Sequence, residues 1–140
     1  MSKELNCIML VDDSPDDNFF HEREIKKANL AHIVITKGSA KKALEYLASK
    51  EEPRSELIFL DINMPGMNGW EFLEEYNRFD SELHSDVIII MLTTSDNLDD
   101  LARAKNWAIV SDYITKPLTR AMMKEIADKY FLAPNGNCLY

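Results

Sequence analysis

The chain has 140 residues and a formal net charge of −8, with 46% hydrophobic and 29% charged residues. These values are typical of one globular domain, and the acidic balance argues against nonspecific binding to nucleic acid or to an anionic membrane surface. No apolar run approaches the length of about 18 residues that a membrane span needs, and the first residues lack a secretory signal. Cytoplasm is therefore the expected compartment. Two cysteines without a CxxC pair and three scattered histidines give no zinc-site pattern.

Short apolar runs alternate with helical patterns over most of the chain. The runs predict strands near residues 8–11, 32–36, 57–60, 87–92 and 112–114. The patterns between them predict helices near residues 15–29, 40–49, 70–79, 98–105 and 119–131. Five βα units in one domain, 5–131, predict an α/β fold with a parallel sheet covered by helices on both faces. Residues 132–140 are expected to form a short C-terminal tail, with no output domain.

The predicted helix after the first strand has a clear start signal. Ser14 supplies a capping hydroxyl, and Pro15 suits the first turn. The acids that follow, Asp16 and Asp17, are favoured by the helix dipole. The sequence therefore predicts that this helix begins directly after Asp13.

Polar side chains stand at the ends of four of the predicted strands. They are Asp12, Asp13, Asp61, Thr93 and Lys116. Because the carboxyl ends of parallel strands share one edge of the sheet, these side chains are expected to meet there. For the strand order 2-1-3-4-5, the ligand crevice falls between the first and third strands, which carry Asp13 and Asp61.

Three carboxylates, a hydroxyl and an ammonium at one rim predict a site for a divalent cation and a phosphoryl group. Unpaired carboxylates would repel each other and raise their pKa values, and a hard cation removes this conflict. Mg²⁺ fits best because it takes one or two carboxylates and keeps waters and phosphate oxygens in its shell. Asp61 is the best candidate nucleophile because it is central. Lys116 would supply a point charge, and Thr93 a hydroxyl donor.

Four segments, in order, carry a family resemblance: Val11–Asp13, Leu60–Gly69, Leu92–Ser95 and Asp112–Leu118. Together with their spacing they make residues 5–131 resemble the receiver domain of two-component response regulators, of the chemotaxis-regulator type. The resemblance implies a flavodoxin-like (βα)5 fold with strand order 2-1-3-4-5.

The resemblance also implies a role for each site residue. Asp61 would be the phosphoacceptor. Mg²⁺, with Mn²⁺ as an alternative, would be bound directly by Asp13, by Asp61 and by the backbone carbonyl of Asn63. Asp12 would act on the metal largely through water, and Lys116 would contact the phosphoryl group. No other cofactor is implied.

A switch and an output surface are implied in the same way. Thr93 would swing toward the phosphoryl group, and Tyr113 would change rotamer as the buried space behind Thr93 changes. The bond between Lys116 and Pro117 would be cis. The surface near residues 98–107, with Tyr113 and the last helix, would carry the signal to a partner.

The implied partners are a sensor histidine kinase or a histidine phosphotransfer protein. The output would be a separate downstream protein or onward phosphotransfer to another carrier in a phosphorelay. The protein would be a signalling domain rather than an enzyme, and a monomer or a homodimer linked to phosphorylation. Neither nucleic acid nor a membrane is an expected partner. Two positions depart from the common pattern: Thr94 replaces a smaller residue beside the phosphoacceptor, and Trp107 would enlarge the partner-facing surface.

Two other functions fit part of this pattern. A Mg²⁺-dependent phosphohydrolase would also use an aspartyl phosphate, but Asn63 stands where such enzymes often carry a second acid. A degenerate receiver that binds partners without phosphorylation would not need Asp61, Thr93 and Lys116. Taken singly, the motifs also have ordinary explanations, such as a helix lead-in for the paired aspartates.

Overall fold

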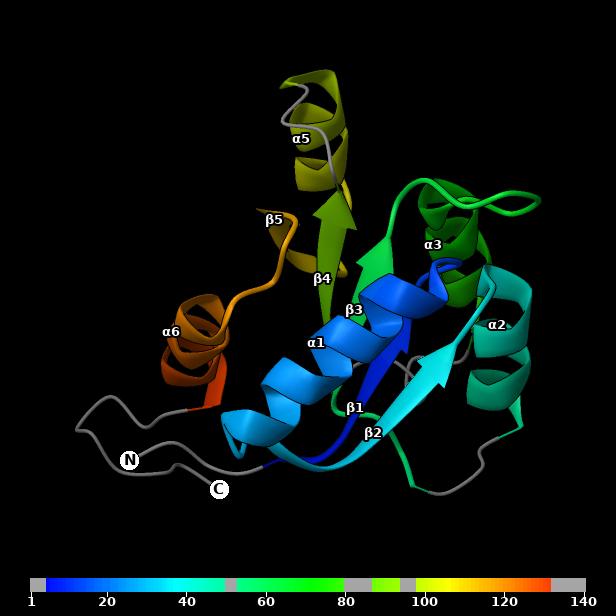
Figure 1. Ribbon diagram of the computed structural model, residues 1–140. Coiled ribbons are helices and arrows are strands. Elements are labelled where there is room, and N and C mark those ends of the chain that lie inside the picture. The colour runs from blue at the N-terminus through cyan, green and yellow to red at the C-terminus, as the bar shows by residue number, and fades with distance from the viewer. Residues whose placement is uncertain (1–4, 50–52, 80–86, 94–97, 132–140) are drawn as a thin grey trace.

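The computed structural model describes residues 5–49, 53–79, 87–93 and 98–131 (Figure 1). Its strands are β1 (Leu5–Val11), β2 (Ala31–Lys37), β3 (Leu57–Asp61), β4 (Ile88–Thr93) and β5 (Val110–Thr115). The helices in this part of the chain are α1 (Pro15–Lys27), α2 (Ala40–Ala48), α3 (Gly69–Asn77), α5 (Leu98–Lys105) and α6 (Arg120–Phe131). Every predicted strand and helix is confirmed, with boundaries that differ by a few residues.

The five strands are parallel and lie in the order β2-β1-β3-β4-β5. This is the flavodoxin-like order that the sequence predicts. The register pairs Val11 with Leu60 and Asp61 with Leu92. The residues that follow β1 and β3 therefore stand side by side at one edge of the sheet.

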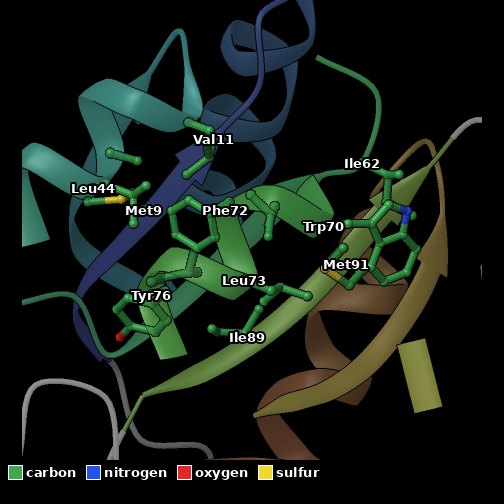
Figure 2. Packing of buried hydrophobic residues seen from close by; sticks show 14 of the residues in the cluster. Met9, Val11, Leu44, Ile62, Trp70, Phe72, Leu73, Tyr76, Ile89 and Met91 are labelled. Atoms are coloured by element: carbon green, nitrogen blue, oxygen red, sulfur yellow. The ribbon is translucent and has the colours of Figure 1, made fainter. Parts of the chain in front are cut away.

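Alternate side chains of the strands point to opposite faces of the sheet and build two cores. One core lies between the sheet and the helices α2, α3 and α5 (Figure 1). Within it, Phe72 and Tyr76 of α3 lie beside Met9 of β1 (Figure 2). Trp70, in the first turn of α3, lies beside Ile62 near the carboxyl edge (Figure 2). This core fixes the position of α3 beneath the loop that follows β3.

The second core lies on the opposite face, between the sheet and the helices α1 and α6. Ile25 of α1 and Met123 of α6 are fully buried there with Leu10 and Phe59 of the sheet. The two helices also contact each other. One side of α1 therefore lies along the segment that connects β5 to α6.

Side-chain caps set the starts of α1, α2 and α3. Ser14 caps α1 by accepting a hydrogen bond from the backbone N–H of Asp17, and Ser39 caps α2 in the same way. Asn68 and Glu71 form a reciprocal capping box at the start of α3. The start signal predicted at Ser14 is confirmed, and it brings the first turn of α1 next to the end of β1.

Among the described residues, no helix is long and apolar enough to cross a membrane. The expectations for Thr94 and for the tail 132–140 fall outside those residues and stay predictions. The domain limits 5–131 also stay a prediction.

Candidate functional site

Four of the predicted site residues converge at the carboxyl edge of the sheet. Asp12 follows β1, Asp61 ends β3 and Thr93 ends β4. Lys116 follows β5, and its backbone N–H donates to the backbone carbonyl of Thr93 at 2.7 Å. The edge predicted from the strand ends is therefore where these residues meet.

Three carboxylates lie close enough to share one cation. One oxygen each from Asp12, Asp13 and Asp61 lies within 4.8 Å of the other two. Asp12 and Asp61 are buried, whereas Asp13 is exposed and lines a hollow of about 360 Å³ together with Asp12. An all-oxygen donor set with room for water suits a hard cation such as Mg²⁺. The residues present therefore fit a divalent-cation site.

The carboxyl group of Asp61 resists ionisation in the absence of a cation. Burial and the charge of Asp12 raise the pKa of Asp61 from the usual 3.8 to about 6, although the ammonium of Lys116 opposes the rise. The carboxylates of the acidic cluster therefore carry more negative charge than the single ammonium of Lys116 can balance. A bound cation would favour the ionised carboxylate and reverse this effect.

The ammonium of Lys116 is surrounded by carboxylates. Its Nζ lies 2.5 Å from Asp12 Oδ2, 2.8 Å from Asp17 Oδ2 and 3.4 Å from Asp61 Oδ1. Burial lowers the pKa of Lys116, but the hydrogen bonds to Asp12 and Asp17 and the charge of Asp61 raise it further. The pKa therefore lies above its usual value, and Lys116 is charged at neutral pH. The bond from Lys116 to Pro117 is cis, as the resemblance implies.

The start of α1 fixes the orientation of Asp12. The backbone N–H of Ser14 donates to Asp12 Oδ1 at 3.0 Å, and Asn18 Nδ2 donates to the backbone carbonyl of Asp12 at 2.9 Å. Since Lys116 takes the other carboxylate oxygen, both oxygens of Asp12 have a partner within the protein. These contacts hold the Asp12 carboxylate in a fixed orientation at the edge of the sheet.

A family model for the response regulator receiver domain matches residues 8–128. The chain belongs to the response regulator receiver family. The receiver is 33% identical to the response regulator Rcp1 of Synechocystis over 123 residues, which cover 83% of this chain and 82% of Rcp1. It is 26% identical to the sensor histidine kinase GacS of Pseudomonas protegens over 123 residues, which cover 88% of this chain but 13% of GacS.

A solved structure shares the fold of this receiver. It is a two-component response regulator from Cytophaga hutchinsonii, with a TM-score of 0.84 and 25% sequence identity. The likeness covers 91% of this chain and 98% of that chain. The sequence relatives and this structural neighbour thus agree on the receiver family.

The remaining predicted residues of the receiver have these positions. Thr93 is fully buried. Tyr113 and Trp107 are partly buried and pack against the core that α2, α3 and α5 cover. Asn63 lies in the loop after β3 with an exposed side chain. The switch roles of Thr93 and Tyr113 and the metal role of Asn63 stay predictions.

Sequence reasoning missed three residues of the receiver site. Asp17 was expected only to favour the start of α1, yet its carboxylate contacts Lys116. His21, one helical turn further, accepts a hydrogen bond through Nε2 from the backbone N–H of Leu118 at 3.2 Å. Gly69 lies against the end of β3. The spacing of four between Asp17 and His21, which puts both on one helix side, was the available signal.

Proposed function

We propose that this receiver accepts a phosphoryl group on Asp61 from a histidine kinase or a histidine phosphotransfer protein. The observation that carries the proposal is the ammonium of Lys116, 3.4 Å from Asp61 Oδ1 at the edge where the acidic cluster lies. A carboxylate nucleophile, a set of oxygen donors for a cation and a positive charge thus meet at one place. Receiver domains are phospho-accepting signalling domains, and these groups support that role here.

In the proposed transfer, one carboxylate oxygen of Asp61 attacks the phosphorus of a phosphohistidine and forms an O–P bond. The P–N bond breaks, and its electron pair stays on the imidazole nitrogen of the donor, which takes up a proton from solvent. Lys116 places its ammonium beside the phosphoryl oxygens and offsets their charge. The receiver would promote only its own phosphorylation and dephosphorylation, with no turnover of an external substrate.

The proposed metal is Mg²⁺, with Mn²⁺ as an alternative. Asp13, Asp61 and the backbone carbonyl of Asn63 would hold it directly, and Asp12 would act through water. When bound, the ion supplies positive charge to the carboxylates and to the phosphoryl oxygens. The exposed position of Asp13 leaves a path for the cation from solvent, whereas burial of Asp61 limits the access of water to the nucleophile.

Thr93 and Tyr113 are the proposed switch residues. Thr93 is fully buried, so a movement of its hydroxyl toward a phosphoryl group would vacate space inside the protein. Tyr113 lies on the neighbouring strand β5 and is partly buried, which supports its proposed response to such a movement. The proposed output surface is the face formed by α5, β5 and α6, which a downstream protein would read.

The proposed setting follows from charge and family. Receiver domains interact with histidine kinases and phosphotransfer proteins, and the net charge of −8 disfavours nucleic acid and anionic membranes as partners. We place the receiver in the cytoplasm, either as a monomer or as a homodimer that forms on phosphorylation.

The test is incubation of the purified protein with acetyl phosphate and Mg²⁺, followed by intact-mass measurement. We expect an adduct with the mass of one phosphoryl group in the wild type and in the control Asp16→Asn, and no adduct in Asp61→Asn. A wild type without the adduct, or an adduct that persists in Asp61→Asn, contradicts the proposal. Repeated turnover of a small phosphoester would instead favour the phosphohydrolase.

A further inference from the structure

The ammonium of Lys116 has three donors, and three carboxylates surround it at unequal distances. The contacts with Asp12 (2.5 Å) and Asp17 (2.8 Å) are hydrogen bonds, whereas Asp61 Oδ1 at 3.4 Å lies beyond the usual range for N–H···O. The ammonium is therefore held by Asp12, after β1, and by Asp17 of α1, and it stays short of full contact with Asp61.

Asp17 contacts the ammonium of Lys116, but it is not one of the three carboxylates of the acidic cluster, Asp12, Asp13 and Asp61. Its backbone N–H is bonded to the capping hydroxyl of Ser14, so Asp17 lies in the first turn of α1, where a carboxylate is favoured by the helix dipole. Its side chain is 42% exposed, whereas that of Lys116 is 9% exposed. The pair thus joins a nearly buried ammonium to a carboxylate that water partly screens.

The backbone around Lys116 is fixed on both sides. Its own N–H is bonded to the carbonyl of Thr93 at 2.7 Å, and the N–H of Leu118 is bonded to His21 Nε2 at 3.2 Å. His21 itself is buried on α1. A change in the partners of the ammonium is therefore a movement of the lysine side chain and does not need a movement of this segment.

We propose that Asp17 is a positioning residue that acts through Lys116. It holds the ammonium toward α1 in the unphosphorylated protein, and the ammonium leaves Asp17 for the phosphoryl group when Asp61 is modified. This inference rests on the proposed function of Asp61. Asp17 then opposes the phosphorylated state, because its ion pair with Lys116 must break before the ammonium can fully contact the phosphoryl oxygens.

The size of the effect follows from the exposure of Asp17. Ion pairs with one partner in contact with water are weak, so loss of this pair is expected to change an affinity by about two- to fivefold. The direction of the change in affinity separates two possible roles of Asp17. A residue that merely supported α1 would weaken the site when removed, whereas a competing counter-ion strengthens the binding of a phosphoryl mimic when removed.

The experiment measures the affinity of the full chain for beryllofluoride, a mimic of the phosphoryl group, by calorimetry in saturating Mg²⁺. We expect Asp17→Asn to bind it about two- to fivefold more tightly than the wild type. Asp17→Glu, which keeps the charge, should stay close to the wild type. Asp16→Asn removes the same charge from an exposed neighbour in the same turn and should leave the affinity unchanged.

Three outcomes decide the question. Equal or weaker binding by Asp17→Asn overturns the role of Asp17, while the proposed function of Asp61 stands. Equal tightening in Asp17→Asn and Asp16→Asn also overturns it, because the effect is then one of general charge. A wild type that does not bind beryllofluoride overturns the proposed function, and with it the inference that rests on it.

Discussion

Gly69 lies directly against the backbone of Asp61. A Cβ built on Gly69 would be 2.8 Å from the carbonyl oxygen of Asp61 and 2.9 Å from the Cα of Ile62. The backbone N–H of Gly69 also donates to the carbonyl of Ile62 at 2.9 Å. The loop after β3 thus closes on the end of that strand through a contact that has no room for a side chain.

Replacement of Gly69 by alanine is expected to lower the free energy of unfolding by about 1–3 kcal/mol, because the atoms it would meet belong to the backbone and cannot rotate away. The gain of about 1 kcal/mol in helix propensity offsets part of this cost. Gly38→Ala is the matched control, since no described atom lies within 4 Å of its Cβ position. Urea unfolding measures both variants, and equal effects would contradict the close approach at Gly69.

The raised pKa of Asp61 makes the stability of the metal-free protein depend on pH. Its pKa is about 6 in the folded protein and about 3.8 when unfolded, so the charged carboxylate destabilises the fold above pH 6. This cost disappears as the pH falls from about 6 to 3.8, because the folded protein takes up the proton first. Asp61→Asn should therefore be more stable than the wild type by about 1–3 kcal/mol at neutral pH, with the difference vanishing in acid.

The measurement is urea unfolding in a chelating buffer across this pH range. Glu45→Gln, which removes an exposed carboxylate on α2, is the control and should stay close to the wild type at neutral pH. A difference between Asp61→Asn and the wild type that is the same at acid and neutral pH would show that the carboxyl group of Asp61 titrates normally.

Much of the fold could be predicted because burial dominates these segments. Every residue of β3 is buried, so its apolar run has no polar interruption before Asp61. The limits of the edge strands are harder to predict from the sequence. The residues of β5 are partly buried or exposed, and the strand begins at Val110, two residues before its predicted start. α1 was predicted to reach residue 29, but it ends at Lys27 because Asn29 takes a positive φ of 54°.

The residues of the site also divide into those that the sequence brings together and those that it does not. Asp12, Asp61, Thr93 and Lys116 could be brought together from sequence because a parallel sheet collects the ends of its strands at one edge. The contact of Asp17 with Lys116 could not, because the rotation of α1 about its own axis is set by packing against the sheet and α6. The spacing of four between Asp17 and His21 predicts that both lie on one side of the helix. It does not predict which part of the protein that side contacts.

Magnesium is expected to stabilise the protein by binding the folded acidic cluster. The gain in the free energy of unfolding grows with the logarithm of concentration and reaches about 2.7 kcal/mol at a hundredfold excess over the dissociation constant. Asp13→Asn should lose most of this gain, because it removes one of the three carboxylates that would hold the ion. Glu45→Gln, an exposed acid on α2, should keep it. Thermal unfolding with and without Mg²⁺ measures the effect, and identical gains in both variants would refute the assignment of Asp13.

His21 is expected to stabilise the segment after Lys116 as a neutral hydrogen-bond acceptor. His21→Leu would leave the backbone N–H of Leu118 without this acceptor, at a cost of about 1–3 kcal/mol in the free energy of unfolding. His21→Gln can present an amide oxygen to the same N–H and should recover part of that loss. If both variants are equally destabilised, the hydrogen bond contributes little and the packing of the ring dominates.

The two variants also separate the pH dependence of His21 from that of Asp61. Burial and the charge of Lys116 lower the pKa of His21 below 6.5, so the unfolded chain takes up the proton first. The stability that neutral His21 provides is complete above pH 6.5 and declines as the pH falls from 6.5 toward the folded pKa. Because protonation of Asp61 acts in the opposite direction, the comparison belongs in an Asp61→Asn background. There, acidification should destabilise the protein with His21 and leave the His21→Gln protein less affected.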